Sequence, residues 1–404
     1  MTFWHSFVSA TRPALDTLVH EFEQSHPHIS LEPQYIQTGD ALAYKLLSTI
    51  QSGTTPDIAW VHSDFLNKLA ASGRIYPIRE LADEYGSGEQ QLFGDIREGL
   101  LTSASWNDTL YALPMEASTL ALVYNESLLR KAGLPPKPPE TWAELKEYTA
   151  RLSLDKNEDG ILERYGFYVP VFTASGPLNM WMIMQWMPFY WQAGGQEVNA
   201  DETKVLFDSP PGIQALAFWK ELWEMQNFTQ FSLSHDNGFV SQTVAMVIDG
   251  PWNLPTYRKI DEFHWNIAPL PSGPAGDFTY LGGEHLAVFR STEHPDAAWE
   301  FLSWVTQPEV QARFAMNSGY LPVSKQALHL PEFQEFLEQD PQYAGFVKLL
   351  GNARVRHRFD RSWMEVNRLL GEAIERSVIG EKSPEKVLRQ SVRKINTELL
   401  AGEK

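Results

Sequence analysis

The fold of this chain is decided by residues 53–61, which read GTTPDIAWV and join a Gly-Thr-Thr-Pro turn to a short apolar strand. The residues before the turn, 40–51, carry leucine and isoleucine at helical spacing, and residues 29–33 predict another strand. A strand over residues 2–7 and a helix that begins at Pro13 precede them. Strand and helix therefore alternate, which is typical of parallel β-α-β units in an α/β domain.

Composition narrows the class of protein. A chain of 404 residues exceeds the usual size of one domain, roughly 100–200 residues, so two or three domains are expected. The absence of cysteine excludes disulfides and thiolate chemistry, and the net charge of −18 disfavours binding to nucleic acid or to an anionic membrane. Because the chain enters a strand directly after Met1, we expect that a secretory or lipoprotein leader has been removed.

Four groups of short motifs, in order along the chain, carry a resemblance to a known family. They lie at residues 3–6 (FWHS) with 53–58; 111–114 (YALP) with 122–125, 131–134 and 139–142; 245–252 (AMVIDGPW) with 269–271 and 282–283; and 318–323 (SGYLPV). Each motif is a turn or strand signal, but their order and spacing extend over nearly the whole chain. The chain resembles the family 1 extracellular solute-binding proteins of ABC importers, which include maltose and glycerol-3-phosphate binders.

The resemblance implies a two-lobed periplasmic-binding-protein fold of the α/β class, with the ligand in a cleft between the lobes. The chain is then expected to cross between lobes near Leu113, Tyr280 and Tyr320. The implied boundaries are 1–112 plus 280–318 for lobe one, and 113–279 plus 319–404 for lobe two, which carries a helical C-terminal extension. Closure about these hinge segments is the motion that such a layout supports.

The same resemblance implies which residues line the cleft, because loops at the C-terminal ends of strands do so in open α/β sheets. The residues matched to these positions are Trp4, His5, Ser6, Asp64, Glu116, Ser118, Asp249, Trp252, Gly282, Gly283, Glu284 and Tyr320. Structural alternatives stay open: His5 as a packed residue at a strand end, Asp64 as a helix cap, and Trp252 as a core residue after a turn. Gly282 and Gly283 could serve only a backbone bend.

Aromatic residues are concentrated at residues 181–191, which contain Trp181, Trp186, Phe189, Tyr190 and Trp191. This pattern predicts either a helix that packs its rings into a core or a stacking platform for the apolar face of a sugar. Trp181 is therefore a further candidate ligand-binding residue.

Two classes of ligand compete. A phosphate needs cationic donors, and the basic stretch 354–358 offers Arg356 or Arg358, in the region where glycerol-3-phosphate binders of the resembled family use an arginine. The structural alternative is that Arg356 and Arg358 are surface residues that contact no ligand. Asp64, Glu116 and Glu284 would repel a dianion but would accept hydrogen bonds from sugar hydroxyls. We favour a neutral di- or oligosaccharide, with glycerol-3-phosphate or a glycerophosphodiester as the alternative.

Residues 155–161 match the first half of an EF-hand loop, with Asp155, Asn157 and Asp159 at alternating positions and Glu163 at the ninth. Gly166 stands at the twelfth position, where a bidentate glutamate is needed, and such turns also form without metal. Calcium is therefore a secondary hypothesis, with a structural role if it binds, and no cofactor is predicted.

A carbohydrate hydrolase would also use paired acids in a cleft, and Glu116 with Asp64 is a formal candidate pair. The sequence contains no nucleophile elbow, phosphate loop or zinc-binding histidine pair. The resemblance instead implies a monomer that binds its ligand without catalysis and delivers it to membrane permease subunits. It would act in the periplasm or outside the cell, either free or as a lipoprotein.

Overall fold

The computed structural model describes residues 1–86, 93–171, 180–227, 234–357, 363–380 and 382–400, and the chain forms two compact units. Unit 1 comprises Met1–Ser118, Pro251–Pro255 and Leu281–Val347, and unit 2 comprises Thr119–Gly250, Thr256–Tyr280 and Lys348–Lys404. Residues 319–347 therefore pack with unit 1, whereas the resemblance had assigned them to lobe two. The reason is long-range pairing: Leu321 forms a β-bridge with Ala117, and the Gln311 side chain bonds both Met115 and Val323.

Unit 1 is built around a five-stranded sheet with the order β2 (Glu32–Tyr35), β1 (Thr2–His5), β3 (Ile58–His62), β12 (Glu284–Val288) and β6 (Leu113–Pro114). β1 pairs in parallel with both β2 and β3, which confirms the predicted β-α-β units. β12 is antiparallel to β3 and to β6. The central strand β3 is buried from Ile58 to Val61, as an interior strand covered on both faces must be.

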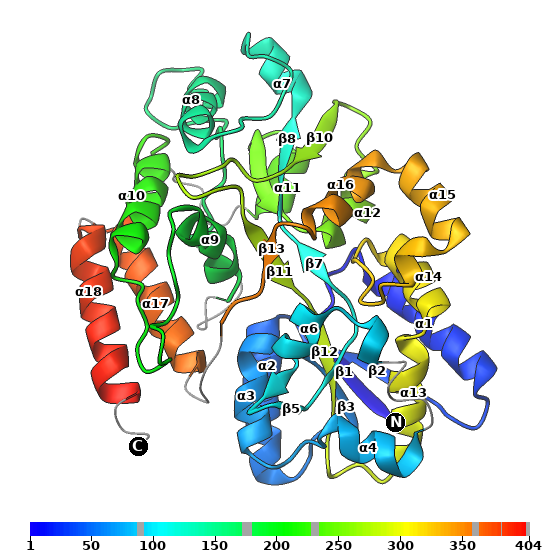
Figure 1. The fold of residues 1–404 in the computed structure, drawn as a ribbon. Coiled ribbons are helices and arrows are strands. Elements are labelled where there is room, and N and C mark those ends of the chain that lie inside the picture. The colour runs from blue at the N-terminus through cyan, green and yellow to red at the C-terminus, as the bar shows by residue number, and fades with distance from the viewer. Residues whose placement is uncertain (87–92, 172–179, 228–233, 358–362, 381, 401–404) are drawn as a thin grey trace. The chain divides into compact units, whose positions relative to one another are not determined.

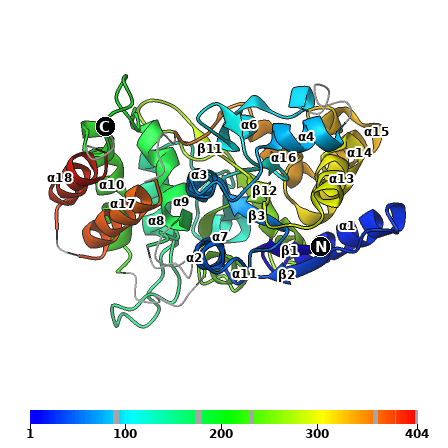
Figure 2. The same ribbon diagram turned by 90° about the horizontal axis from the view of Figure 1, so that it is seen from below.

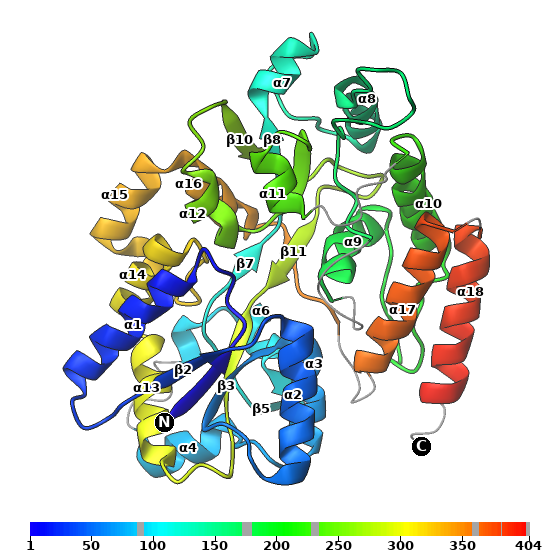
Figure 3. The ribbon, with the colours of Figure 1, turned by 180° about the vertical axis from the view of Figure 1, so that it is seen from behind.

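Helices cover both faces of this sheet. α2 (Gly39–Ser52) and α3 (Ser63–Ala71) lie on one face, and α1 (Arg12–Ser25) and α13 (Pro295–Val305) lie on the other, as the opposite views in Figures 1 and 3 show. The remaining elements of unit 1 are α4 (Ile78–Tyr85), α6 (Glu98–Ser103), β4 (Ser105–Trp106), β5 (Thr109–Leu110), η1 (Pro251–Asn253), α14 (Pro308–Ser318), η2 (Ala327–His329), α15 (Pro331–Gln339) and α16 (Pro341–Leu349), whose last two residues belong to unit 2.

Unit 2 holds an antiparallel sheet with the order β10 (Trp265–Ala268), β8 (Ala121–Asn125) and β9 (Met246–Asp249). Three of its helices, α10 (Pro210–Glu224), α17 (Trp363–Val378) and α18 (Pro384–Lys394), lie side by side in Figures 1 and 2. The last two form the predicted helical C-terminal stretch. The remaining elements are α7 (Glu126–Lys131), α8 (Trp142–Leu152), α9 (Met180–Gln192), α11 (His235–Val240), α12 (Leu254–Tyr257), which begins in unit 1, and a π-helical turn over Ile395–Leu399.

The chain passes between the units within short extended segments. β7 (Ser118–Thr119) and β11 (Thr279–Gly282) each contain one crossing, and both belong to a three-stranded sheet with β13 (Ala353–Arg354). The candidate residues Ser118 and Gly282 lie in these two strands. The crossings therefore fall close to the predicted positions at Leu113 and Tyr280.

Candidate functional site

Strand ends of unit 1 meet at one edge of its sheet. β1, β3 and β6 run in the same direction, and the register pairs Glu284 of β12 with His62 and His285 with Pro114. The C-terminal ends of β3 and β6 therefore lie beside the N-terminal end of β12. We call this the strand-end edge, and it carries the candidate residues His5, Ser6, Asp64, Glu116, Gly283 and Glu284. Ligands of open α/β sheets bind at such an edge.

Glu116 is the most unusual side chain of the strand-end edge. It is fully buried, and its Oε2 accepts the backbone N–H of Glu284 at 2.9 Å. Its Oε1 has no hydrogen-bond partner among the residues that the structure describes. Burial and the neighbouring Glu284 carboxyl raise the pKa of Glu116 well above its usual value. A buried acceptor without a partner costs stability, so a hydroxyl that donated to it would bind favourably.

Gly283 allows this arrangement by its lack of a side chain. A Cβ at position 283 would lie 2.3 Å from the backbone oxygen of Glu116, which is closer than real contacts allow. The glycine is therefore required by the close approach of two backbones and does more than permit a bend.

Asp64 lies in the first turn of α3 and does not cap it. The capping residue is His62, whose Nδ1 accepts the Asp64 backbone N–H at 3.2 Å. The Asp64 carboxyl is buried near the positive end of the helix, with Oδ2 3.9 Å from His62 Nδ1. This placement keeps Asp64 at the strand-end edge, two positions after His62, which pairs with Glu284.

Successive residues of β1 point to opposite faces of the sheet. The Lys45 ammonium of α2 lies 3.8 Å from the centre of the Trp4 ring, and the Ser6 hydroxyl donates to the Ile36 carbonyl at 2.9 Å. The His5 ring faces the α1 side, where its centroid is 5.7 Å from that of Phe3. Trp4 and Ser6 therefore do not share a face with His5.

His5 lines a pocket of about 380 Å³ together with Arg12, Asp16 and Tyr35. Burial and the charge of Arg12 lower its pKa to about 4, against the opposing charge of Asp16. The imidazole is therefore neutral at neutral pH, and its Nδ1 accepts the Phe7 N–H at 3.3 Å. The packed-residue interpretation of His5 fits these contacts better than a ligand contact at the strand-end edge.

Trp252 and Tyr320 come together in unit 1. Their ring centroids are 5.9 Å apart, and both side chains are buried. Gly319 makes the approach possible: it ends α14 with φ +86°, and a Cβ there would lie 2.2 Å from the Pro251 carbonyl oxygen. Tyr320 also contacts Phe7, at 5.8 Å between centroids, so the pair belongs to a larger group of rings.

Asp249 lies in the core of unit 2 and is fully buried. Its Oδ2 accepts the Tyr257 hydroxyl, and its Oδ1 lies 3.2 Å from His235 Nε2 and accepts the Gly250 N–H at 2.8 Å. These partners engage both carboxylate oxygens, and the expectation that Asp249 contacts the ligand rests on the family resemblance alone. Its carboxylate anchors the turn that leads to Trp252.

The aromatic concentration over residues 181–191 divides into two parts. Trp186, Phe189, Tyr190 and Trp191 are buried in unit 2, so the core interpretation is confirmed for these four. Trp181 alone among the five is partly exposed, and its ring centroid lies 4.9 Å from that of His235.

Comparisons with known proteins agree with this architecture. The sequence model of the family described as bacterial extracellular solute-binding protein matches residues 17–345. The chain belongs to this family. Its members are substrate-binding proteins of transport systems and are not enzymes. Within the ranges that the structure describes, no helix has the length and apolarity needed to cross a membrane.

Individual relatives of this solute-binding protein cover most of its length. A maltotriose-binding protein of Pyrococcus abyssi is 27% identical, over 87% of this chain and 72% of its own. An sn-glycerol-3-phosphate-binding periplasmic protein of Salmonella paratyphi A is 23% identical, over 100% of this chain and 93% of its own. A Listeria monocytogenes substrate-binding protein, solved with cycloalternan, has a TM-score of 0.85 at 21% identity, covering 100% of this chain and 99% of that one. This likeness confirms the expected two-lobed α/β fold.

The arginine expected to hold a phosphate is engaged elsewhere in unit 2. Arg356 is buried, and its guanidinium donates to Asn367 Oδ1 at 2.9 Å and lies 3.6 Å from Glu197 Oε2. It also stacks over the Trp363 ring at 5.0 Å. Arg356 thus joins elements of the core of unit 2. Arg358, the other candidate, lies outside the described residues.

The EF-hand-like loop is closed by its own hydrogen bonds. Asp155 Oδ2 accepts the Gly160 N–H, Asn157 Oδ1 accepts the Asp159 N–H, and Glu163 Oε2 accepts the Lys156 N–H. Over the described ranges, no group of three or more histidine, aspartate or glutamate side chains is placed to hold a metal ion. The calcium hypothesis therefore gains no support from this geometry.

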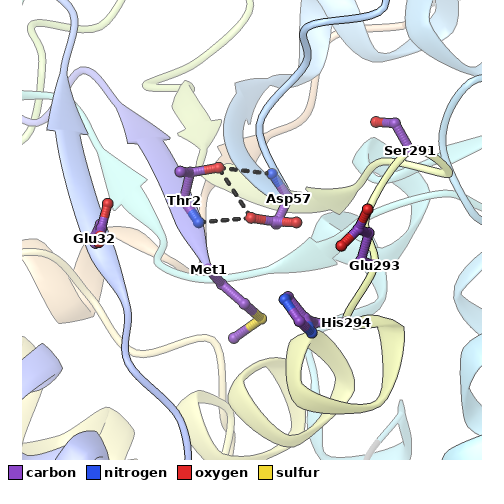
Figure 4. A pocket seen from close by; sticks show the side chains of 7 residues that line it. All are labelled: Met1, Thr2, Glu32, Asp57, Ser291, Glu293 and His294. Carbon is purple, nitrogen blue, oxygen red and sulfur yellow. Dashed lines mark hydrogen bonds between the residues drawn. The ribbon is translucent and has the colours of Figure 1, made fainter.

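A second pocket of unit 1, of about 420 Å³, lies at the opposite ends of the strands (Figure 4). Asp57 stands at its centre: Oδ2 accepts the N–H and hydroxyl of Thr2, and Oδ1 accepts the Thr292 hydroxyl at 2.6 Å. Burial opposes ionisation of Asp57, but these hydrogen bonds outweigh it and lower the pKa. The polar groups here join strand ends to each other, so we assign this pocket a structural role.

Sequence analysis did not single out His62, His235 and Tyr257, which contact the candidate residues Asp64 and Asp249. His62 follows directly after a predicted strand, and that position was a usable signal. His235 and Tyr257 meet only through Asp249, and no local pattern marks them.

Proposed function

We propose that this protein captures a neutral di- or oligosaccharide for an ABC importer and delivers it to membrane permease subunits. The observation that carries the proposal is Glu116, a buried carboxyl beside a second carboxyl, Glu284, with one oxygen that no described residue bonds. A sugar hydroxyl can donate to that oxygen, whereas a phosphate dianion would be repelled by Glu284 and Asp64. Relatives named for maltotriose binding support the same class of ligand.

The alternative ligand is glycerol-3-phosphate or a glycerophosphodiester. It is supported by the relative named for sn-glycerol-3-phosphate and by a Mycobacterium tuberculosis structure, solved with glycerophosphocholine, that shares the fold. The contacts of Arg356 with Asn367 and Glu197 weigh against it, because that guanidinium would have to leave its core partners to bind a phosphate.

A thermal-shift screen tests the proposal. Maltotriose, cellotriose, mannotriose, glycerol-3-phosphate and glycerophosphocholine should be compared at equal concentrations. A ligand at one hundred times its dissociation constant stabilises the folded protein by about 2.7 kcal/mol. Stabilisation by a saccharide, reduced in Glu116→Gln and unchanged in the exposed control Glu332→Gln, is the expected result. Stabilisation only by the phosphorylated compounds would overturn the ligand class.

We further propose that the protein is a monomer without catalytic activity. It would act outside the cytoplasm, either free or anchored by a lipid. Incubation with the bound saccharide followed by chromatography should recover it intact. Cleavage products that disappear in Glu116→Gln would instead indicate a hydrolase, which needs two carboxyls about 5–9.5 Å apart.

A further inference from the structure

Between β9 and the end of α12 the chain leaves unit 2 for five residues and then returns. Pro251–Pro255 belong to unit 1, whereas Gly250 before them and Thr256 after them belong to unit 2. We call Pro251–Pro255 the excursion. It carries the candidate residue Trp252, whose ring centroid lies 5.9 Å from that of Tyr320 in unit 1. The position of Trp252 therefore depends on how the two ends of the excursion are held.

Two side chains of unit 2 join these ends. Asp249, the last residue of β9, lies two positions before the excursion, and Tyr257, the last residue of α12, lies two positions after it. The Tyr257 hydroxyl donates to Asp249 Oδ2, and Asp249 Oδ1 accepts the Gly250 N–H at 2.8 Å. Both side chains are buried, so water competes little for these hydrogen bonds. The bond from Tyr257 to Asp249 thus closes the loop that contains the excursion.

His235 of α11 makes the third contact of this group, with its Nε2 3.2 Å from Asp249 Oδ1. The charged groups that act on the imidazole are Asp249 from β9 and Asp236 on its own helix. Two phenols complete its polar surroundings, Tyr168 at 6.2 Å between ring centroids and Tyr257 on the shared carboxylate. Burial opposes protonation of the imidazole, but the two aspartates outweigh it and raise the pKa of His235.

We propose that Asp249, Tyr257 and His235 form a clasp that fixes the excursion, and that protonation of His235 tightens this clasp. A charged imidazole gives the Asp249 carboxylate a charge-assisted hydrogen bond, which is roughly twice as strong as a neutral one. The three are positioning residues, because they hold the ends of the segment that carries Trp252. The consequence for ligand binding rests on the proposed function, whereas the clasp itself does not.

The pH dependence of the clasp has a definite sign. His235 binds its proton more tightly in the folded protein than in the unfolded chain. Its contribution is therefore complete below about pH 6.5, the ordinary histidine pKa, and is lost as the pH rises through the higher folded-state pKa. Tyr257 adds no transition in this range, because burial and the Asp249 charge raise the pKa of Tyr257 well above its ordinary value. The excursion should be held most firmly in mildly acidic solution.

Hydrogen–deuterium exchange followed by mass spectrometry tests the clasp without a ligand. After correction for the intrinsic pH dependence of exchange, wild-type peptides that contain the excursion should exchange about fivefold faster once His235 has lost its proton. Tyr257→Phe should accelerate their exchange about tenfold at every pH, because it removes one hydrogen bond to a charged group. His235→Gln keeps a donor but cannot carry charge, so its exchange should not vary with pH.

The matched control is His264→Gln, at an exposed histidine of unit 2, which should keep the wild-type pH dependence. Peptides from α10 report unfolding of unit 2 as a whole and should be unchanged in every variant. Equal exchange of the excursion in wild type and Tyr257→Phe would overturn the clasp. A pH dependence that persists in His235→Gln would overturn the role of protonation.

Calorimetry with the tightest binder among maltotriose, cellotriose and mannotriose tests the link to ligand binding. The ratio of wild-type to His235→Gln affinity should fall by up to about fivefold as the pH rises. Taking this ratio cancels the titration of Glu116, which both proteins share. A ratio independent of pH, together with the expected exchange results, would overturn only the link to the ligand. If no saccharide binds the wild type, the proposed function fails, while the exchange results still decide the clasp.

Discussion

The buried Glu116 carboxyl predicts an uncommon dependence of stability on pH. Its pKa is raised in the folded protein, so on raising the pH the unfolded chain loses its proton first, near the ordinary glutamate value of about 4.3. Above that pH, the contribution of Glu116 to the free energy of unfolding should fall until its folded-state pKa is reached. Glu116→Gln keeps the size and an acceptor oxygen but cannot ionise, so it should lack this fall.

The magnitude follows from linkage. While the folded protein holds one proton more than the unfolded chain, stability falls by about 1.4 kcal/mol per pH unit. Between the unfolded-state and folded-state pKa values of Glu116, the difference between wild type and Glu116→Gln should therefore shift in favour of the variant as the pH rises, by at most about that amount per pH unit.

Urea unfolding followed by tryptophan fluorescence, without ligand and in steps from pH 4.5 to 7.5, measures the divergence. Glu284→Gln removes the neighbouring charge and should narrow the range of pH over which wild-type stability falls. Glu332→Gln, on the exposed surface of α15, should follow the wild type. Parallel curves for wild type and Glu116→Gln over the whole range would refute the assignment of Glu116 as a buried, proton-holding carboxyl.

Three further predictions follow from the geometry. Asp57→Asn should lower the free energy of unfolding at pH 7 by about 1 kcal/mol. Because the pKa of Asp57 is lowered in the folded protein, the stability difference between wild type and variant should shrink as the pH falls through that pKa. A difference that stays constant in acid titrations would contradict this prediction. Gly319→Ala should destabilise the protein by more than about 1 kcal/mol, because position 319 has a φ of +86° and an added Cβ would meet Pro251. Gly94→Ala, whose added Cβ would meet open space, should be nearly neutral in thermal unfolding. Arg356→Met should lower the melting temperature and leave saccharide affinity unchanged in calorimetry; loss of glycerol-3-phosphate binding in this variant would instead support the alternative ligand.

The sequence predicts the elements of unit 1 well because their signals are local. β3 is a short apolar run after a turn, and α2 begins at the capping residue Thr38 and ends at Gly53 with φ +72°. Residues 319–347 were misassigned because the bridge from Leu321 to Ala117 joins positions far apart in the chain, and no local pattern reports it.

The same difference between local and long-range signals applies to the candidate residues. Positions that directly follow predicted strands, such as Asp64, are found at the strand-end edge, because the C-terminal ends of parallel strands share one edge. Glu116 and Glu284 are 168 positions apart, and their contact could be expected only through the family resemblance. The contacts of Asp249 could not be predicted from the sequence, because its partners, His235 and Tyr257, reach it from other elements.

The candidate residues of unit 1 are concentrated where the chain leaves and re-enters that unit. Glu116 lies two positions before Ser118, the last residue before the first crossing, and Glu284 lies three positions after Leu281, the first residue after the return. Trp252 belongs to Pro251–Pro255, a five-residue excursion into unit 1. Closure of two domains is absorbed by torsions of a few residues in such segments. A ligand hydroxyl bound by Glu116 would shift the equilibrium between conformations only by the difference in its interaction energy between them.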